Sequence, residues 1–405
     1  MRALILGLAL TAAAHPLAAQ RVRVHDVPPR PALFASADTN SAATYYIWGS
    51  QNLERDPARA AAAFYWAYRL NPRWADALYA RRVALHLADP SRLVRYMDRV
   101  RGTVRNPEVM AIDSLHLRAL TIDPFLVGKF DRILITQWLI HSVNQEMSRG
   151  GGSGNMALAH HVVQTWLMDS RADPYMRAWY AYSEGRYPAA IEQYERELRR
   201  ARRDEKARWR TDLGRLHFLS GNNDRSLEHF AAAIQEMRAE DQRDVVFVYE
   251  SKALLEQSIG AVHEKAGNTA AAREAYGRAL TEDLSYYPAH QRLAWLALAA
   301  GDTAAAVSEM ALAAEVAKDD GVVQYEHGLI LAMAGKAQEA DAALKRAVAV
   351  EPYFAEPYLA LARLHDASGL PEALEHYRAF LAHATRDHPQ RPAAEARVSA
   401  LAAAR

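Results

Sequence analysis

The sequence of 405 residues contains no cysteine. Disulfide bonds, zinc sites built from thiolates and cysteine nucleophiles are therefore excluded, and no cysteine is present for lipid attachment. An excess of one charge is also missing, because 49 basic residues nearly balance 48 acidic ones and leave a formal net charge of +1. This balance gives no whole-molecule argument for binding nucleic acid or an anionic surface.

Long hydrophobic runs are missing as well, apart from a short one at the start of the chain. Arg2 is followed by an apolar run at residues 3–14 and then by Leu17-Ala18-Ala19. This order is typical of a secretory signal cleaved after Ala19. The alternative, an uncleaved membrane anchor, needs roughly 20 apolar residues. We therefore expect an exported protein, periplasmic or secreted and soluble, without an integral membrane span.

The motifs of common catalytic and cofactor sites are also missing. No His-Glu-x-x-His pattern, Gly-x-Ser-x-Gly elbow or dinucleotide fingerprint occurs. The densest group of histidines consists of His116, His141, His160 and His161. It offers no ligand pair at helical spacing with a carboxylate partner. The glycine-rich run at residues 150–154 lacks the ending of a phosphate-binding loop and is interpreted as a linker. We expect no catalytic residue, no metal site and no cofactor.

Four glycines recur at a fixed spacing of 34 residues: Gly267, Gly301, Gly335 and Gly369. A small residue stands seven positions before each. After the first three, alanines follow at five and twelve positions and a large residue follows at nine. Around Gly335 these positions hold Gly328, Ala340, Ala347 and Leu344. We expect Gly328 and Ala340 to face each other where two antiparallel helices cross, with Leu344 filling the layer between the helices.

Each unit carries the signals of two helices. Apolar residues recur at spacings of three and four along residues 324–335, which indicates one buried helical stripe. The periodic glycine stands where the first helix ends, in a left-handed cap that glycine adopts without a steric penalty. Pro352 then prevents the second helix from continuing. Because no such unit can bury its apolar face alone, the units are expected to stack into a solenoid.

The 34-residue period and its order of small and large residues resemble the tetratricopeptide repeat, a helix-turn-helix unit. The resemblance covers residues 171–388 and, more weakly, residues 41–107. It implies an all-α fold, an α-α superhelical solenoid, and a function in holding other proteins or peptides. Some family members hold a C-terminal carboxylate with an asparagine-lysine clamp, which is missing here. The positions of its asparagine carry Gly49, Trp179, Arg215, Ala261, Trp295, Leu329 and Arg363.

The patterns divide the chain into five regions. We expect a signal peptide at residues 1–19 and an extended, mobile arm rich in proline and alanine at residues 20–42. Degenerate helical repeats and helical hairpins are expected at residues 43–170. The tetratricopeptide array follows at residues 171–388, and a capping helix follows at residues 389–405.

Several helix bounds can be predicted. In the N-terminal part we expect helices at residues 44–53, 57–70, 74–87, 91–104, 108–120 and 125–147. Between Gly221 and Gly267 the spacing exceeds the period by twelve residues. The excess includes residues 245–249, whose composition also suits a strand. Because an all-helical array offers a strand no partner, we expect a lengthened first helix from about residue 243 to residue 265.

The family resemblance also implies a binding surface, because first-helix residues beside the small core positions line the inner groove. Aromatic and arginine side chains, which form binding hot spots, are frequent there. Packing of the aromatic residues between neighbouring units is the alternative. Trp179 and Arg215 hold equivalent positions in adjacent units and are expected side by side on the concave wall. Mapped by register, the partner-binding groove comprises Tyr175, Trp179, Tyr182, Arg208, Arg215, Phe218, Gln257, Glu264, Gln291, Trp295, Tyr325 and Arg363.

These features together indicate an exported scaffold or adaptor that binds a protein or peptide in its concave groove, rather than an enzyme. The basic run at residues 199–203 is flanked by acidic residues and is interpreted as a solvated helix end, so we expect no nucleic-acid partner. Two other classes stay open. One is a self-associating scaffold of the cell envelope, and the other is an enzyme with a site in the helical segment 108–170.

Overall fold

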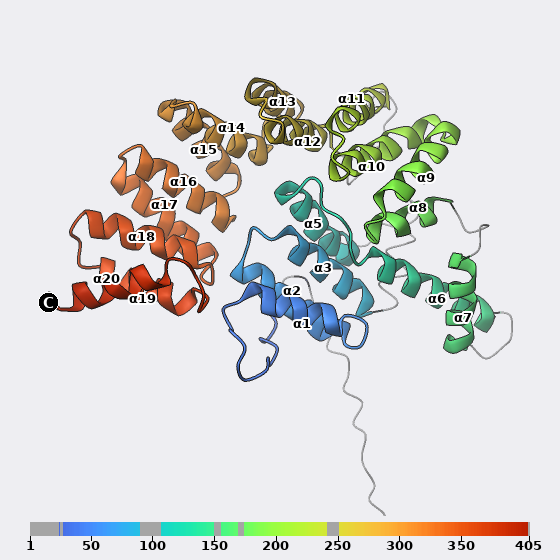
Figure 1. Ribbon diagram of the computed structural model, residues 1–405, viewed down its shortest axis with the longest axis horizontal. Coiled ribbons are helices and arrows are strands. Elements are labelled where there is room, and N and C mark those ends of the chain that lie inside the picture. Colours follow the sequence, from blue (N-terminus) through green and yellow to red (C-terminus); the bar gives the residue numbers. More distant parts are fainter. Residues whose placement is uncertain are drawn as a thin grey trace, which may run out of the picture.

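The computed structural model describes residues 24, 27–89, 107–149, 155–168, 174–240 and 251–403. Within these ranges the chain forms 19 α-helices and no strand. Helices α8 to α19 follow an arc, and α1, α2, α3 and α5 lie inside it (Figure 1). The expected all-α solenoid is confirmed. No helix of the described part has both the length and the apolar character needed to cross a membrane.

As far as the structure describes it, the array consists of six antiparallel helix pairs, and each pair is one repeat. A short 3-10 turn, Arg203–Glu205, precedes the second pair, and a final helix packs on the last pair. The pairs and the final helix are α8 (Pro174–Ser183) with α9 (Tyr187–Arg200), α10 (Lys206–Leu219) with α11 (Asn223–Glu240), α12 (Lys252–Lys265) with α13 (Thr269–Glu282), α14 (Tyr287–Ala299) with α15 (Thr303–Val316), α16 (Gly321–Met333) with α17 (Ala337–Val350), α18 (Ala355–Ala367) with α19 (Ala373–His383), and α20 (Arg391–Ala403).

Each first helix of the array is followed, two residues after its last residue, by a glycine with a positive φ. The values lie between 66° and 81° at Gly185, Gly221, Gly267, Gly301, Gly335 and Gly369. In this left-handed region a Cβ would be strained. After Gly335, the N–H of Lys336 donates back to the carbonyl of Leu331 at 2.9 Å, which closes the helix end. The predicted left-handed caps are confirmed.

The predicted small positions lie where the two helices of a repeat cross. A Cβ added at Gly328 would lie 2.6 Å from Leu344 Cγ and 3.3 Å from the carbonyl oxygen of Ala340. Gly214 has the same relation to Phe230 in the second pair, at 2.6 Å. The large residue nine positions after the cap therefore packs on the small residue seven positions before it.

Six further helices precede the array in the described part of the chain. They are α1 (Ala42–Asn52), α2 (Pro57–Leu70), α3 (Ala75–Leu87), α5 (Pro107–Ile122), α6 (Asp131–Arg149) and α7 (Met156–Met168). The bounds of α2 are those predicted. The pair α1 and α2 repeats the close crossing, because a Cβ at Gly49 would lie 2.8 Å from the Phe64 ring. The predicted helix at 91–104 and the glycine-rich run at 150–154 lie outside the described residues.

Two predicted helix starts are wrong. The helix expected from residue 125 begins at Asp131, because the Asp123 side chain accepts the Phe125 N–H at 2.9 Å and holds a turn there. The helix expected from residue 243 begins at Lys252. Ser251 is extended (φ −101°, ψ 147°), and its hydroxyl caps the helix by accepting the Leu254 N–H at 3.1 Å. The candidate strand at 245–249 lies outside the described residues.

The N-terminal helices pack against the concave side of the array. One buried apolar cluster joins α1, α2, α3, α5 and α6 to α12, α13 and α14. The arm that was expected to be mobile is held where it is described: the Asn40 side chain donates to the carbonyl of Ala382 at 2.8 Å, and Asp38 accepts the N–H of Arg386 at 2.7 Å. The last repeat therefore contacts the segment that precedes the first helix.

Candidate functional site

The predicted groove residues lie on the first helices of the six repeats, from α8 to α18. Tyr175 is on α8, but its side chain lies outside the described part, and Arg208 is half-buried on α10. The remaining groove residues fall into three groups: a wall on α8, α10 and α12, a polar network on α12, α14 and α16, and an open pocket between α16 and α18.

The wall binds backbone carbonyls of the chain's own residues 121–126, which we call the internal segment. Tyr182 on α8 donates its hydroxyl to the carbonyl of Leu126 at 3.4 Å. Arg215 on α10 donates its Nε–H to the carbonyl of Pro124 at 3.1 Å, and both groups are buried. Two side chains from adjacent repeats therefore hold carbonyl groups two residues apart in one loop.

The wall also holds the end of α5 and one aromatic ring. Gln257 on α12 donates to the carbonyl of Thr121 at 3.2 Å and accepts the hydroxyl of Tyr286. Phe218 on α10 stacks on Phe125, with ring centroids 3.6 Å apart and planes at 18°. Four of the predicted groove residues thus contact the internal segment.

Trp179 contacts a different part of the chain from its neighbour Arg215. Its indole N–H donates to Asp131 at 2.7 Å, and the Tyr79 hydroxyl donates to the other carboxylate oxygen. Burial raises the pKa of Asp131 to about 7, while the hydrogen bond from Trp179 opposes the rise. Trp179 therefore fixes the start of α6, and Arg215 holds the loop before it.

The polar network is built on two buried or half-buried carboxylates. Glu326 accepts hydrogen bonds from Gln291 at 2.7 Å and from Trp295 at 2.9 Å, and its other oxygen pairs with Arg73 at 2.9 Å. Glu264 accepts the hydroxyl of Tyr276 at 2.6 Å. Glu264 also accepts the Nε–H of Arg292 on α14 at 3.1 Å. Gln291, Trp295 and Glu264 thus connect repeats to each other, and Glu326 connects the array to the turn before α3.

Residues that the sequence did not single out reinforce this junction. Arg118 on α5 pairs with Asp320 at 3.2 Å, and Arg69 on α2 pairs with Glu351 at 3.0 Å. Burial raises the pKa of Glu351 to about 7 in spite of Arg69. The partners lie more than 200 positions apart in sequence, so no local spacing could have paired them.

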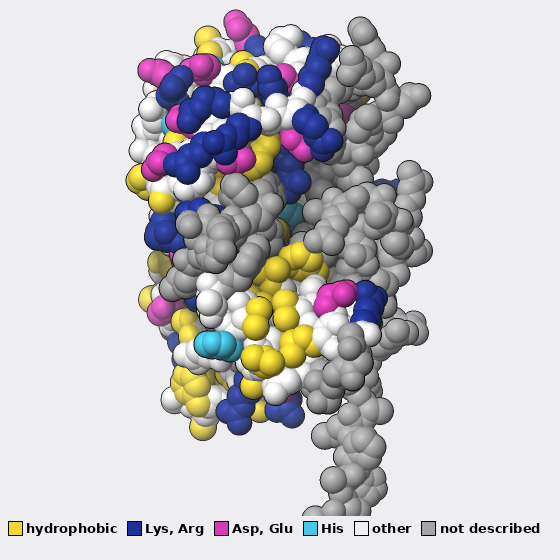
Figure 2. All heavy atoms as spheres, turned by 90° about the vertical axis from the view of Figure 1, so that its right-hand side faces the viewer, with side chains coloured by type: hydrophobic (Ala, Val, Ile, Leu, Met, Phe, Trp, Pro, Cys, Tyr) yellow, Lys and Arg dark blue, Asp and Glu magenta, His cyan; other side chains and the backbone are white. Residues whose placement is uncertain are grey.

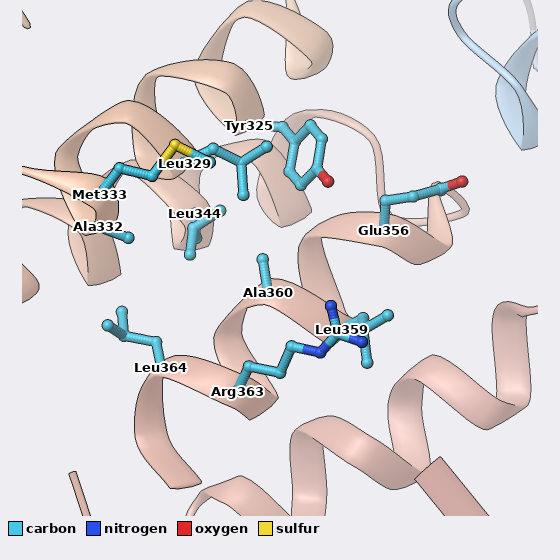
Figure 3. Close-up of a pocket in the computed structure, with 10 residues that line it drawn as sticks. All are labelled: Tyr325, Leu329, Ala332, Met333, Leu344, Glu356, Leu359, Ala360, Arg363 and Leu364. Atoms are coloured by element: carbon cyan, nitrogen blue, oxygen red, sulfur yellow. The ribbon is translucent and has the colours of Figure 1, made fainter. Parts of the chain in front are cut away.

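The third group opens into a pocket of about 370 Å³ between α16 and α18. Its floor is apolar, and Met333 at its edge is 62% exposed. Glu356 and Arg363 supply the charged groups, and Arg363 also donates to Gln390 at 2.6 Å. Figure 3 shows its lining residues, which are Tyr325, Leu329, Ala332, Met333, Leu344, Glu356, Leu359, Ala360, Arg363 and Leu364.

Tyr325 and Arg363 are the two predicted groove residues that line this pocket. The aliphatic residues between them were not predicted from the sequence, although Leu329 stands at a clamp position. Their helical spacing of three and four was visible, but it also marks the buried face of any repeat. Only the distance between adjacent first helices decides which of these residues line an opening.

One lateral face of the molecule presents charged and apolar regions separately. Figure 2 shows basic side chains with acidic ones among them toward the top, and hydrophobic side chains gathered below. On α9 the basic residues pair locally, as Arg196 does with Glu192 at 2.7 Å. This agrees with a solvated helix end.

The apolar side chains of Met156, Leu158 and Val162 on α7 are exposed.

Two histidine side chains stack on each other outside the groove. His217 on α10 and His229 on α11 stack with ring centroids 5.2 Å apart. Burial, together with the neighbouring His217, lowers the pKa of His229 to about 4. Among the described residues, no group of three or more histidine and carboxylate side chains is placed to hold a metal ion.

No model of a known protein family matches the sequence, and no curated protein matches it. Several solved structures resemble part of the chain. A crystal structure of MamA protein is 17% identical, with a TM-score of 0.36, and covers 44% of this chain and 92% of its own. The C-terminal part of a TPR repeat-containing protein from Cytophaga hutchinsonii is 16% identical, with a TM-score of 0.41, and covers 51% of this chain and 77% of its own. A tetratricopeptide repeat protein from Parabacteroides merdae is 14% identical, with a TM-score of 0.41, and covers 52% of this chain and 78% of its own.

The internal geometry of the repeats decides the architecture. The 34-residue unit pairs two antiparallel helices, places a left-handed glycine after the first, and seats a large side chain on a small one. These are the properties that the sequence pattern predicted for the tetratricopeptide unit. The chain is accordingly an all-α solenoid of helix-turn-helix repeats that resemble the tetratricopeptide unit.

Proposed function

We propose that this protein is an interaction scaffold whose concave groove binds an extended peptide segment of a partner protein. One observation carries the proposal: the predicted groove residues already bind a peptide stretch, since Tyr182, Arg215 and Gln257 take three of its backbone carbonyls. Backbone carbonyls are present in every peptide, so this wall has the chemistry of a peptide-binding surface.

The open pocket between α16 and α18 is the part of the groove that we assign to the partner. Its volume falls in the range of ligand sites, roughly 300–1,000 Å³. Leucines and the flexible Met333 suit a large apolar side chain of variable shape. Arg363 suits a carboxylate or carbonyl of the same peptide, and Glu356 suits a basic group.

The test uses peptides selected from a random library on the purified protein. They should carry a large apolar residue, and their binding should be lost in Ala360→Trp, which fills the pocket. A matched control is Leu284→Asp, because Leu284 is 81% exposed outside the pocket. Peptides that bind Ala360→Trp as tightly as the unaltered protein would overturn the assignment.

We also propose that the protein acts after export. The support is the signal-like order of Arg2, the apolar run at 3–14 and Leu17-Ala18-Ala19. Protein isolated from the envelope or medium should begin at Gln20. Intact mass measurement decides the matter, since an envelope-localised protein that still begins at Met1 would contradict cleavage.

A self-associating scaffold is the second candidate. The exposed side chains of Met156, Leu158 and Val162 on α7 favour it, because grouped apolar exposure is typical of interaction surfaces. Light scattering separates the two candidates. A monomer at micromolar concentration would support the adaptor. An oligomer that is lost in the Leu158→Glu variant would support self-association.

A further inference from the structure

The internal segment makes its backbone contacts with side chains of three successive repeats. The carbonyls of Thr121, Pro124 and Leu126 are bound from α12, α10 and α8 in turn. The segment therefore crosses the repeats one after another, in the direction opposite to their order in sequence. A separate peptide laid across the wall could make the same contacts.

One side chain of the segment enters an aromatic and aliphatic cavity. Phe125 is only 7% exposed and lies between Phe218, at 3.6 Å, and Phe230, at 6.2 Å. Leu255 and Ile259 of α12 belong to the same cluster. This cavity is formed by the array, so it is a place for one aromatic residue of whatever chain crosses the wall.

The shape of the segment is maintained by local bonds. The Asp123 carboxylate accepts the N–H of Phe125 at 2.9 Å, and the Asp123 carbonyl accepts the N–H of Leu126 at 3.2 Å. Pro124 restricts its own φ at the centre of this turn. The Asp-Pro-Phe-Leu sequence thus forms a compact turn with its own local hydrogen bonds.

We propose that residues 121–126 are an internal ligand of the wall on α8, α10 and α12, and that an external partner of this wall carries the same Asp-Pro-Phe-Leu chemistry. The internal segment is covalently tethered, so its effective concentration is high and it excludes a weak competitor. An external peptide gains access only when the internal segment is weakened or displaced. The proposal rests on the proposed function in that both use the concave groove, but the open pocket on α16 and α18 is a site separate from the wall.

The experiment uses the full chain with Phe125→Ala, which empties the aromatic cavity. The probe is a fluorescein-labelled peptide with the sequence of residues 118–129, and a matched peptide has alanine in place of the phenylalanine. Binding is followed by fluorescence anisotropy. We expect the probe to bind Phe125→Ala at least about tenfold more tightly than the unaltered protein, and to raise the melting temperature of the variant.

The matched peptide should bind neither protein, and adding Phe218→Ala to the variant should remove the binding. If Phe125→Ala does not fold, the same titration is made on Phe125→Leu, which keeps an apolar side chain but loses the ring stacking. A folded variant that binds both peptides equally, or neither, overturns the proposal. The pocket variant Ala360→Trp should leave probe binding unchanged, so the two sites are tested separately.

Discussion

At the scale of single residues, the tightest packing in each repeat is a small residue under a large one. Gly328 lies under Leu344, and Gly260 lies under Tyr276, where a Cβ would be 2.5 Å from the ring. Such positions tolerate no added volume, because protein interiors are close-packed. A glycine on a solvent-facing helix surface is different. Gly277 on α13 has nothing within 4 Å of an added Cβ.

The first prediction compares these two kinds of glycine. Gly328→Ala should destabilise the protein by about 1 to 3 kcal/mol, because its Cβ meets Leu344. Gly277→Ala should stabilise it by about 0.5 to 1 kcal/mol, since alanine favours the helix and meets no neighbour. Thermal unfolding of both variants measures the difference. Equal shifts in the same direction would show that the crossing has room to spare.

The second prediction concerns the buried carboxyl of Asp131. Its pKa is about 7 in the folded protein, compared with about 3.8 for an aspartate in an unfolded chain. The folded state therefore holds the proton more tightly, so the carboxyl's contribution to stability is present at low pH and is lost as the pH rises from about 4 to 7.

Asp131→Asn does not titrate and provides the reference. Between pH 5 and pH 8, the unaltered protein should lose up to roughly 3 kcal/mol of stability relative to this variant. Urea unfolding at several pH values measures the difference, in which the histidines common to both proteins cancel. Parallel pH profiles would contradict the raised pKa.

At the scale of single helices, the sequence signals for ends were of unequal strength. Glycine caps were predicted correctly, because the period fixed their place and the left-handed φ has few alternatives. The start of α12 was missed although Ser251 precedes an apolar run, since the twelve extra residues before it were assigned to the same helix. The start of α6 was missed because Asp123-Pro124 was not interpreted as a turn.

The third prediction tests the caps. The Asp302 side chain accepts the N–H of Ala305 at 2.9 Å, so Asp302→Ala should cost about 0.5 to 2 kcal/mol. Asn268 holds the equivalent position before α13, but its side chain makes no capping hydrogen bond. Asn268→Ala is thus the matched control and should change the melting temperature less. A larger effect for Asn268→Ala would mean that the cap geometry does not decide helix stability here.

At the scale of the whole molecule, the repeats of the array contact distant parts of the chain as well as their neighbouring repeats. Arg73 binds Glu326, Arg118 binds Asp320, and Asn40 reaches the carbonyl of Ala382. The sequence predicted the repeats because their period is local. It could not predict these contacts, because nothing in the sequence around a charged residue identifies a partner that lies hundreds of positions away. It also named the groove residues without indicating that the chain's own loop would cross them.

The fourth prediction follows from this junction. In an open solenoid, the damage from Gly328→Leu would stay near α16. Here it should also reduce amide protection in α2 and α3, while α9 and α11 keep theirs. The reason is that Arg69 on α2 pairs with Glu351 just after α17, and Arg73 in the turn before α3 pairs with Glu326 on α16. Hydrogen exchange followed by mass spectrometry measures each helix. Loss confined to α15, α16, α17 and α18 would show that the junction transmits nothing.

The contact between Asn40 and Ala382 also sets an order of events during synthesis. The two residues are 342 positions apart, so at roughly 5–20 residues per second the ribosome needs about 17 to 70 s to produce the second after the first. For most of this time Trp66 and Arg118 are already made, while their partners Tyr353 and Asp320 are not. The nascent chain therefore carries apolar and charged surfaces that its later repeats cover in the folded protein. A chaperone that holds those surfaces would be needed longest for the helices made first.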